Sequence, residues 1–398
     1  MRKQMSYIKD TKHVLQKIHI ANEEGKVTED INLVSADFEN MYGKMPLHLS
    51  MEGIRKFCQE AGFTGEDEKP ETGEILEALD LCQENNVFEF DEKLYRQKRG
   101  HATGQKQAPP VACAGAGIAE EQWLSNPQVA ELFSNYGRYI DDILSFFNGD
   151  KDKCEWAFSE FNKLYPGELI LTWEWSDSKL VFLNIELIIN RDKNIIETKY
   201  YIKPTNQRLF LNFRSNHPQH VFRAVVYGMA LQGLLVNSRN EWNFEYLKDL
   251  REKFLQQEYP MDLINSQFSK ALEVDRLDLL FKTPAQRKKS KKKVVAPLIL
   301  TFNPGNPPVK SWINEELSNL YQDPKMKKTF PNIDVVYRQN RNIRSRIMRN
   351  RYTKRKEDQN QVVHQQAGNF KLHSTRCKLC DRMEDGTTKW RSNKTKRE

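Results

Sequence analysis

The chain lacks the features that mark secreted and membrane-spanning proteins. It has only six cysteines in 398 residues, and apart from Cys377 and Cys380 they are scattered, which argues against a disulfide framework. No charged and apolar leader opens the sequence, and no apolar run approaches the roughly 18 residues that a membrane-spanning helix needs. There is also no internal repeat. We therefore expect an intracellular protein, nuclear or cytoplasmic, with no membrane partner.

What the chain does contain is enough apolar material for a sizeable core and an excess of positive charge. Hydrophobic residues make up 38% of the sequence, and its length predicts two or three domains. The net charge of +8 is concentrated in residues 287–293 and 338–356, and nine of the 19 residues in the second run are Lys or Arg. The first run has three interpretations that the sequence leaves open, namely a nuclear-import signal, a phosphate contact and a plain solubilising linker. The second favours contact with nucleic acid, through residues that include Arg338, Arg341 and Arg344.

Two apolar, β-prone runs flank a pair of adjacent carboxylates, Asp141 and Asp142. The first run ends at Ile140, and residues 143–147 form the second, followed by a turn signal. Adjacent aspartates in so apolar a context would repel each other unless a cation or solvent lay against them. The pattern predicts a metal-binding hairpin, and the alternative is an Asp-Asp turn in an ordinary hairpin.

A second acidic run strengthens the metal-binding interpretation. The short apolar strand predicted at residues 31–36 delivers Asp37 at its end. Two strands that each end in a carboxylate can converge on a pair of divalent ions about 4 Å apart, which activate a 3′-hydroxyl and neutralise a leaving pyrophosphate. We therefore expect Asp37, Asp141 and Asp142 to be catalytic residues and ligands of two Mg²⁺ ions, with Mn²⁺ as a substitute.

The two acidic runs resemble the palm motifs of reverse transcriptases. Residues 139–142, Tyr-Ile-Asp-Asp, match the family's Tyr-x-Asp-Asp motif, and Asp37 matches its first metal-ligand motif. The resemblance implies that Asp37 and Asp141 bridge both ions and that Asp142 supports the site. It also implies that the main-chain carbonyl of Phe38 completes the coordination and that Tyr42 is the aromatic gate that excludes a ribose 2′-hydroxyl.

Residues 95–110 form a glycine-bearing basic turn before a predicted small-residue helix at 111–118. Small residues let a backbone approach a base pair or sugar closely, and cations suit phosphates. By itself this segment could be any polar loop. Between the two acidic motifs it resembles the template- and nucleotide-contacting motif of reverse transcriptases. The residues implied are Gly104 and Gln105 for the nucleotide, and Arg99 and Lys106 for nucleic acid.

Further motifs resemble the Penelope-like retroelement family, over about residues 6 to 380. They include SYIKD (6–10), NVFEF (86–90), TKYYIKPT (198–205) and HPQHV (217–221). The chain departs from the family pattern where Gln105 and Gln107 replace a small residue and an aromatic. No basic fingers strands are predicted before Asp37, and no GIY-YIG endonuclease pattern is found. We therefore expect an N-terminally truncated member that lacks the fingers and the endonuclease and has reduced or no activity.

The resemblance implies an α+β fold, namely a right-hand polymerase palm of antiparallel sheet and packed helices, followed by a helical thumb and a basic C-terminal region. The expected regions are the palm at 1–213, the thumb-like region at 214–285, a basic linker at 286–296 and the C-terminal region at 297–398. Alternating apolar patterns predict strands at 169–173, 180–189, 195–202 and 209–211. The pattern in residues 220–281 is helical, and a helix bundle with no nucleic-acid role would show the same periodicity.

Two smaller sets of residues complete the candidates. Lys199 and Lys203 could face phosphate, on or after the predicted strand 195–202. His373, Cys377 and Cys380 would supply three of the four ligands of a structural zinc site, and the alternative is two free thiols on a tail.

Three functions follow from these patterns. The first is an RNA-directed DNA polymerase of a retroelement, acting on an RNA template, a DNA primer or an RNA–DNA hybrid, and deoxynucleoside triphosphates. The second is a catalytically silent relic of such an element that binds nucleic acid. The third, which has the least support, is a structural protein with no nucleic-acid partner.

Overall fold

The computed structural model describes residues 6–65, 69–282, 296–302, 309–325 and 333–338. The chain divides into two compact units, Met1–Val294 and Val295–Glu398. The first unit combines helices with antiparallel sheets. Among the described residues, no helix is long and apolar enough to cross a membrane.

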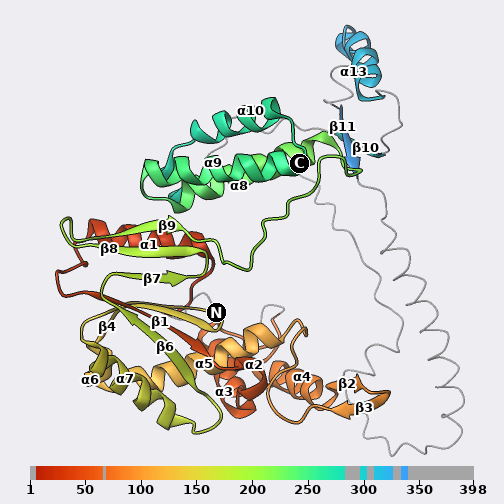
Figure 1. Ribbon diagram of the computed structural model, residues 1–398. Coiled ribbons are helices and arrows are strands. Elements are labelled where there is room, and N and C mark those ends of the chain that lie inside the picture. The colour runs from red at the N-terminus through yellow and green to blue at the C-terminus, as the bar shows by residue number, and fades with distance from the viewer. Residues whose placement is uncertain (1–5, 66–68, 283–295, 303–308, 326–332, 339–398) are drawn as a thin grey trace, which may run out of the picture. The chain divides into compact units, whose positions relative to one another are not determined.

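A four-stranded antiparallel sheet forms the middle of the first unit (Figure 1). Its strands lie in the order β4-β5-β1-β6, so that β1 is central and β4 is an edge. Both neighbours of β1 come from much later in the sequence, and the sheet therefore joins distant segments. The bounds are β1 (Asn32–Phe38), β4 (Phe133–Tyr139), β5 (Asp142–Phe147) and β6 (Leu171–Ser176).

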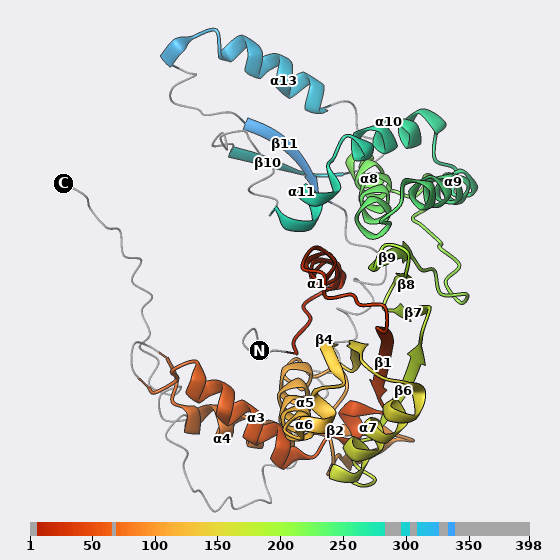
Figure 2. The ribbon, with the colours of Figure 1, turned by 90° about the vertical axis from the view of Figure 1, so that its left-hand side faces the viewer.

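Both faces of β1 are covered, because successive side chains of a strand point to opposite faces. Val34 and Phe38 belong to one core cluster, and Leu33 belongs to the other. The first cluster includes residues of three helices, α3 (Leu47–Glu60), α5 (Ala108–Leu124) and α7 (Lys151–Leu164). The second includes residues of α1 (Thr11–Glu23) and of a second sheet. Figure 2 shows α1 and α5 on opposite sides of the central sheet.

Helices α3 and α5 approach each other closely because both carry small residues. A Cβ at Gly53 of α3 would lie 2.5 Å from the carbonyl carbon of Ala114 in α5. No larger residue fits this position without moving a helix backbone. The small-residue helix predicted at 111–118 is confirmed, and it is longer than expected.

The second sheet has three antiparallel strands, β7 (Lys179–Phe182), β8 (Ile185–Asn190) and β9 (Ile195–Tyr200). The single strand predicted at 180–189 is wrong, because the chain turns at Leu183 and Asn184 between β7 and β8. Leu183 has a φ of 54°, which leucine rarely adopts.

The helical pattern predicted for residues 220–281 is confirmed. The helices are α8 (Gln219–Val236), α9 (Asn240–Gln256), α10 (Met261–Leu272) and α11 (Arg276–Phe281). The first three share a core that includes Phe222, Leu250 and Phe268. The strand predicted at 209–211 is wrong, because these residues have no regular secondary structure. Leu209 is exposed, and the ring of Phe210 instead stacks 4.5 Å from that of Phe254 in α9.

A small hairpin, β2 (Val87–Phe90) and β3 (Lys93–Arg96), follows helix α4 (Thr72–Glu84). Every residue of both strands is exposed, and α4 has no buried residue. Phe90 and Leu94 are 69% and 75% exposed. The hairpin therefore contributes nothing to a core.

The remaining elements are short or belong to the second unit. The first unit also contains α2 (Met41–Lys44) and α6 (Pro127–Ala130). In the second unit, β10 (Ala296–Thr301) and β11 (Ile333–Arg338) pair in parallel, and α13 (Val309–Leu320) lies between them in sequence. The side chain of Lys310 in α13 forms an ion pair with Asp334.

Candidate active site

The acidic turn joins β4 and β5. Tyr139 and Asp142 face each other in the ladder, so Ile140 and Asp141 form a two-residue turn between the strands. Ile140 has a φ of 58°, which is rare for a β-branched residue. Such outliers persist only where the surrounding structure imposes them, and they concentrate at functional sites.

Asp37 lies directly opposite Asp142 in the ladder between β1 and β5. Directly opposed residues of antiparallel strands point to the same face of the sheet, with Cβ atoms about 4.5–5.5 Å apart. The main-chain nitrogen of Phe38 donates a hydrogen bond of 3.3 Å to the carbonyl oxygen of Asp141. The strands thus bring the three predicted carboxylates to the same end of the sheet.

The electrostatics of the site reflect this crowding of negative charge. Burial, followed by the charges of Asp141 and Asp37, raises the pKa of the Asp142 carboxyl to about 6, although Lys203 opposes this shift. Burial and then Asp141 also raise the pKa of Asp37. A cation between these groups would relieve their repulsion.

The donor set fits a hard divalent cation. Carboxylate oxygens are the ligands that Mg²⁺ prefers, and Mg²⁺ usually takes one or two carboxylates together with waters and substrate phosphates. In the described parts of the chain, no three His, Cys, Asp or Glu side chains form a compact metal-binding group. Asp37 and Asp142 therefore pair across the ladder, but with Asp141 they do not form a ready three-ligand group in this structure.

Tyr42 lies beside this site. Its side chain packs against the core cluster of α3, α5 and α7, and its pKa is raised by burial and by the nearby Cys113 and Asp141. Its main-chain oxygen accepts a hydrogen bond of 2.6 Å from the nitrogen of His101. A Cβ at Gly100 would overlap that same oxygen. The predicted basic turn is thus held against the backbone of the predicted sugar gate.

The side chain of Gln105, in that turn, forms hydrogen bonds with two neighbouring amides. The Gln105 amide donates to the Asn86 side chain (3.0 Å) and accepts from Gln107 (2.6 Å). Gly104 and Lys106 are exposed.

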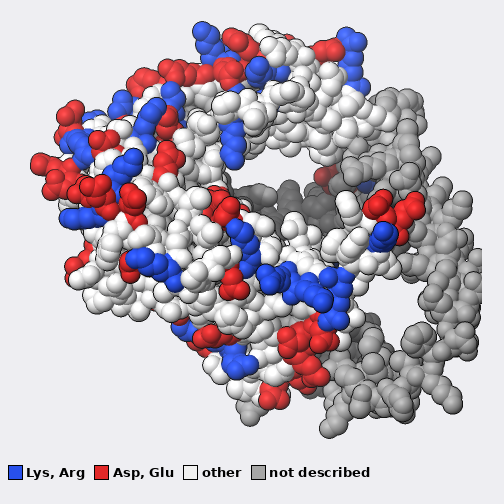
Figure 3. All heavy atoms as spheres, turned by 60° about the horizontal axis from the view of Figure 1, so that its bottom comes forward, with Lys and Arg blue, Asp and Glu red and all other residues white. Residues whose placement is uncertain are grey.

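Arg99 lines a separate cavity of about 560 Å³, whose other basic side chains are Lys44, His48 and Lys98. Figure 3 shows that Lys and Arg also gather in a band on one face of the molecule.

The two predicted phosphate contacts lie in different surroundings. Lys203 is exposed and close enough to Asp142 to lower its pKa. Lys199 instead forms an ion pair of 3.2 Å with Glu245 and lies 5.6 Å from the centre of the Trp242 ring. Lys203 is therefore the lysine that the structure brings to the acidic site.

The C-terminal candidates are mostly outside the described residues. Arg338 ends β11 in the second unit, and its Nε donates to Thr301 (3.3 Å). Arg341, Arg344, His373, Cys377 and Cys380 lie outside the described ranges.

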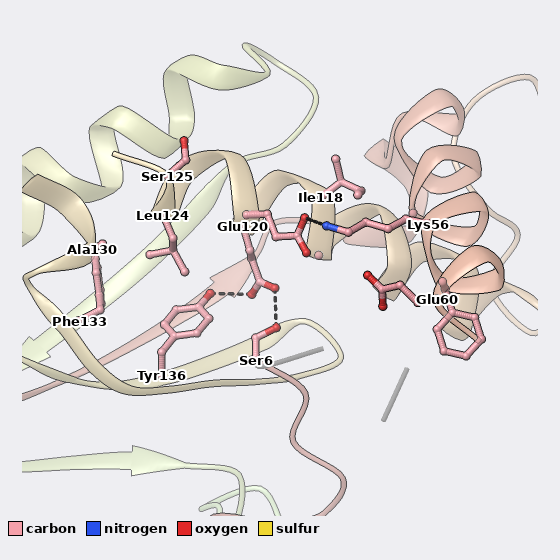
Figure 4. Close-up of a pocket in the computed structure, with 14 residues that line it drawn as sticks. Ser6, Lys56, Glu60, Ile118, Glu120, Leu124, Ser125, Ala130, Phe133 and Tyr136 are labelled. Carbon is pink, nitrogen blue, oxygen red and sulfur yellow. Dashed lines mark hydrogen bonds and ion pairs between the residues drawn. The ribbon is translucent and has the colours of Figure 1, made fainter. Parts of the chain in front are cut away.

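Sequence reasoning missed the buried ion pair of Arg138 and Glu120 behind the turn (2.8 Å). Both side chains are 3% exposed. The available signal was a charge within the small-residue helix and another in the strand before the acidic turn, since a buried charge needs a partner. Glu120 also lines a cavity of about 730 Å³ between α3, α5 and β4, together with Ser6 and Tyr136 (Figure 4).

Comparison with known protein families gives one partial match. The model of the animal helix-turn-helix domain matches residues 209–269, which include α8, α9 and most of α10. This is well under half of the chain and assigns no family to the whole. A comparison with curated proteins finds no match.

Solved structures give partial matches. Telomerase from Candida albicans, in complex with a TWJ fragment of telomeric RNA, is 12% identical, with 70% of this chain and 52% of that chain covered and a TM-score of 0.47. Apo telomerase from Candida tropicalis is 13% identical, with 68% and 47% covered and a TM-score of 0.41. The RNA-dependent RNA polymerase of a human picorbirnavirus is 12% identical, with 66% and 49% covered and a TM-score of 0.40. The chain spans about half the length of these proteins.

Proposed function

We propose that the chain is an RNA-directed DNA polymerase of the Penelope-like kind with reduced activity, in which residues 1–213 form the palm and residues 214–285 form the thumb. One observation carries the proposal: Asp37 faces Asp142 across β1 and β5, and Asp141 lies in the adjoining turn. Two strands that each present a carboxylate at the same end of a sheet would support a pair of Mg²⁺ ions. An ordinary Asp-Asp turn would not need a third aspartate on the neighbouring strand.

The proposed reaction joins a deoxynucleotide to a primer. The primer 3′-hydroxyl gives its proton to solvent, its oxygen forms a bond to the α-phosphorus, and the bond from that phosphorus to the bridging oxygen of pyrophosphate breaks. Bound Mg²⁺ would activate the hydroxyl and neutralise the leaving pyrophosphate. Asp37 and Asp141 would hold the ions, and Asp142 would support the site.

Two further side chains have roles in this proposal. Tyr42 would exclude a ribose 2′-hydroxyl, because its half-buried ring lies beside Asp141 on a fixed backbone. Lys203 would contact a phosphate, because it is an exposed cation next to Asp142.

Metal-dependent primer extension on an RNA template tests the proposal. Wild type should extend the primer with Mg²⁺ and not with EDTA, and Asp141→Ala should lose the activity. Asp80→Ala is the matched control, because Asp80 is an exposed acid on α4. Equal extension by wild type and Asp141→Ala, or none by wild type, would count against copying.

A second candidate function is nucleic-acid binding without copying. The cavity whose lining includes the adjacent cations Lys98 and Arg99 favours it, because cations that bind a polyanion release its counterions. The double variant Lys98→Ala/Arg99→Ala should then weaken RNA binding and flatten its salt dependence. Binding that does not change would contradict this function.

A further inference from the structure

Arg138 and Glu120 form an ion pair in a place where charges are costly. Arg138 lies in edge strand β4 and Glu120 in the small-residue helix α5, and the arginine Nε is 2.8 Å from the carboxylate Oε1. Both are almost fully buried. Desolvation of two buried charges often cancels their attraction, so stability alone is a weak reason for such a pair.

The other two arms of the guanidinium bind main-chain oxygens. Nη1 donates to the carbonyl of Ile140 (2.7 Å), and Nη2 donates to the carbonyl of Cys113 in α5 (3.0 Å). Ile140 is the residue with the rare positive φ, and the next residue is Asp141. Arg138 thus connects the rigid helix to the strained turn.

The carboxylate of Glu120 is itself fixed on both oxygens. Its Oε1 also accepts from the Tyr136 hydroxyl (2.6 Å), and its Oε2 accepts from the Ser6 hydroxyl (3.0 Å) (Figure 4). The backbone of Arg138 is held as well, because its nitrogen donates to the Ser6 carbonyl and its oxygen accepts from the Ile8 nitrogen. The network leaves the guanidinium little freedom to move.

We propose that Glu120 and Arg138 are positioning residues, which hold the Ile140-Asp141 turn so that the Asp141 carboxylate stays next to Asp37. The inference rests on the proposed metal-dependent function of the acidic site. An arginine suits this task because its planar fork has donors in fixed directions, whereas a lysine offers one mobile point charge.

The main test is Arg138→Lys, which keeps the charge and loses the fork. Mn²⁺ affinity, measured by electron paramagnetic resonance without substrate, should fall about tenfold or more, as when other groups that orient metal ligands are removed. In primer extension, kcat should fall by a similar factor while the KM for the deoxynucleotide stays within about twofold, because the turn and not the nucleotide site is altered. A folded Arg138→Lys variant with wild-type Mn²⁺ affinity would overturn the proposal.

Replacement of Ile140 separates positioning from a general loss of packing. Glycine adopts positive φ without strain, so the Ile140→Gly variant should not need the arginine to keep its turn. In that background, Arg138→Lys should cost less than about threefold in Mn²⁺ affinity, which is a measurable coupling between the two sites. An equal loss in both backgrounds would show that Arg138 does not act through Ile140.

Glu120→Gln provides a second route and has a neighbouring control. It keeps the shape of Glu120 and removes the charge that anchors Arg138, so Mn²⁺ affinity should fall as in Arg138→Lys. Glu121→Gln changes the next residue, whose ion pair with Lys56 is exposed, and should leave the affinity unchanged. Equal effects of the two glutamine variants would contradict the proposal.

The outcomes also distinguish this inference from the proposed function. A wild type that does not extend a primer, but binds Mn²⁺ in a manner abolished by Asp141→Ala, would refute copying and leave the positioning role supported by the affinities. A wild type that binds no Mn²⁺ would overturn the positioning role.

If neither variant folds, ¹⁵N NMR of the Arg138 Nε–H in wild type decides. Slow hydrogen exchange with water and a shift of the signal on Mg²⁺ addition would support the role. Fast exchange, or no shift, would overturn it.

Discussion

Replacement of Gly100 by alanine should destabilise the first unit more than a comparable change elsewhere. Gly100 has a φ of 65°, and a Cβ there would overlap the main-chain oxygen of Tyr42 and lie 2.6 Å from the carbonyl carbon of Gly43. A left-handed alanine costs about 1–2 kcal/mol. Overlap with a backbone that cannot move adds about 1–3 kcal/mol. The expected loss in the free energy of unfolding is therefore about 2–5 kcal/mol.

Gly62→Ala is the matched control for this change. Gly62 has nearly the same φ, 68°, but a Cβ there would meet nothing within 4 Å. It should lose only the backbone cost of about 1–2 kcal/mol. Equilibrium unfolding in urea, followed by tryptophan fluorescence, gives both values if the m-value stays constant. Equal destabilisation by the two substitutions would refute the close approach of the basic turn to Tyr42.

The remaining predictions concern the core, a buried histidine and the sugar gate. Phe158→Ala should cost about 3–5 kcal/mol, because Phe158 is fully buried among Trp123, Phe133 and Trp173, whereas Phe244→Ala, at an exposed ring, should change the urea midpoint little. Burial lowers the pKa of His101 in the folded protein. As the pH falls below about 6.5, this histidine therefore takes up a proton in the unfolded chain before it does so in the folded one, and the free energy of unfolding should decrease. Urea titrations at pH 7.5 and pH 5.5 measure this decrease in the free energy of unfolding. It should be smaller in His101→Gln than in wild type and unchanged in His48→Gln, a control at an exposed histidine. The same decrease in both variants would exclude His101 as its source. Tyr42→Ala should raise incorporation of ribonucleotides relative to deoxynucleotides in single-nucleotide extension, and an unchanged ratio would argue against the gate.

The sequence predicted the central sheet because the pattern of each strand is local. Alternating or continuous apolar runs ended at Asp37 and flanked Asp141, and the structure pairs these strands in the ladder that brings Asp37 opposite Asp142. The approach of the two distant strands, which end at Asp37 and begin beside Asp141, was predicted because isolated carboxylates at apolar strand ends need a shared partner.

Other features depend on contacts that no local pattern encodes. The turn at Leu183 lies in an apolar run without glycine or proline, and Thr11 donates to the Asn184 side chain from another element. Arg138 and Glu120 are single charges whose partnership depends on the packing of β4 against α5. The cavities arise from the same packing and leave no trace in sequence spacing.

The unburied hairpin β2–β3 shows where the chain can change length. Its strands pair with each other and bury none of their side chains, so residues added at the tip between Phe90 and Lys93 would disturb no core packing. Loop tips of this kind accept inserted segments more readily than any other part of a fold. Insertion of an affinity tag there, instead of at either terminus, should leave the four-stranded sheet and its acidic turn undisturbed.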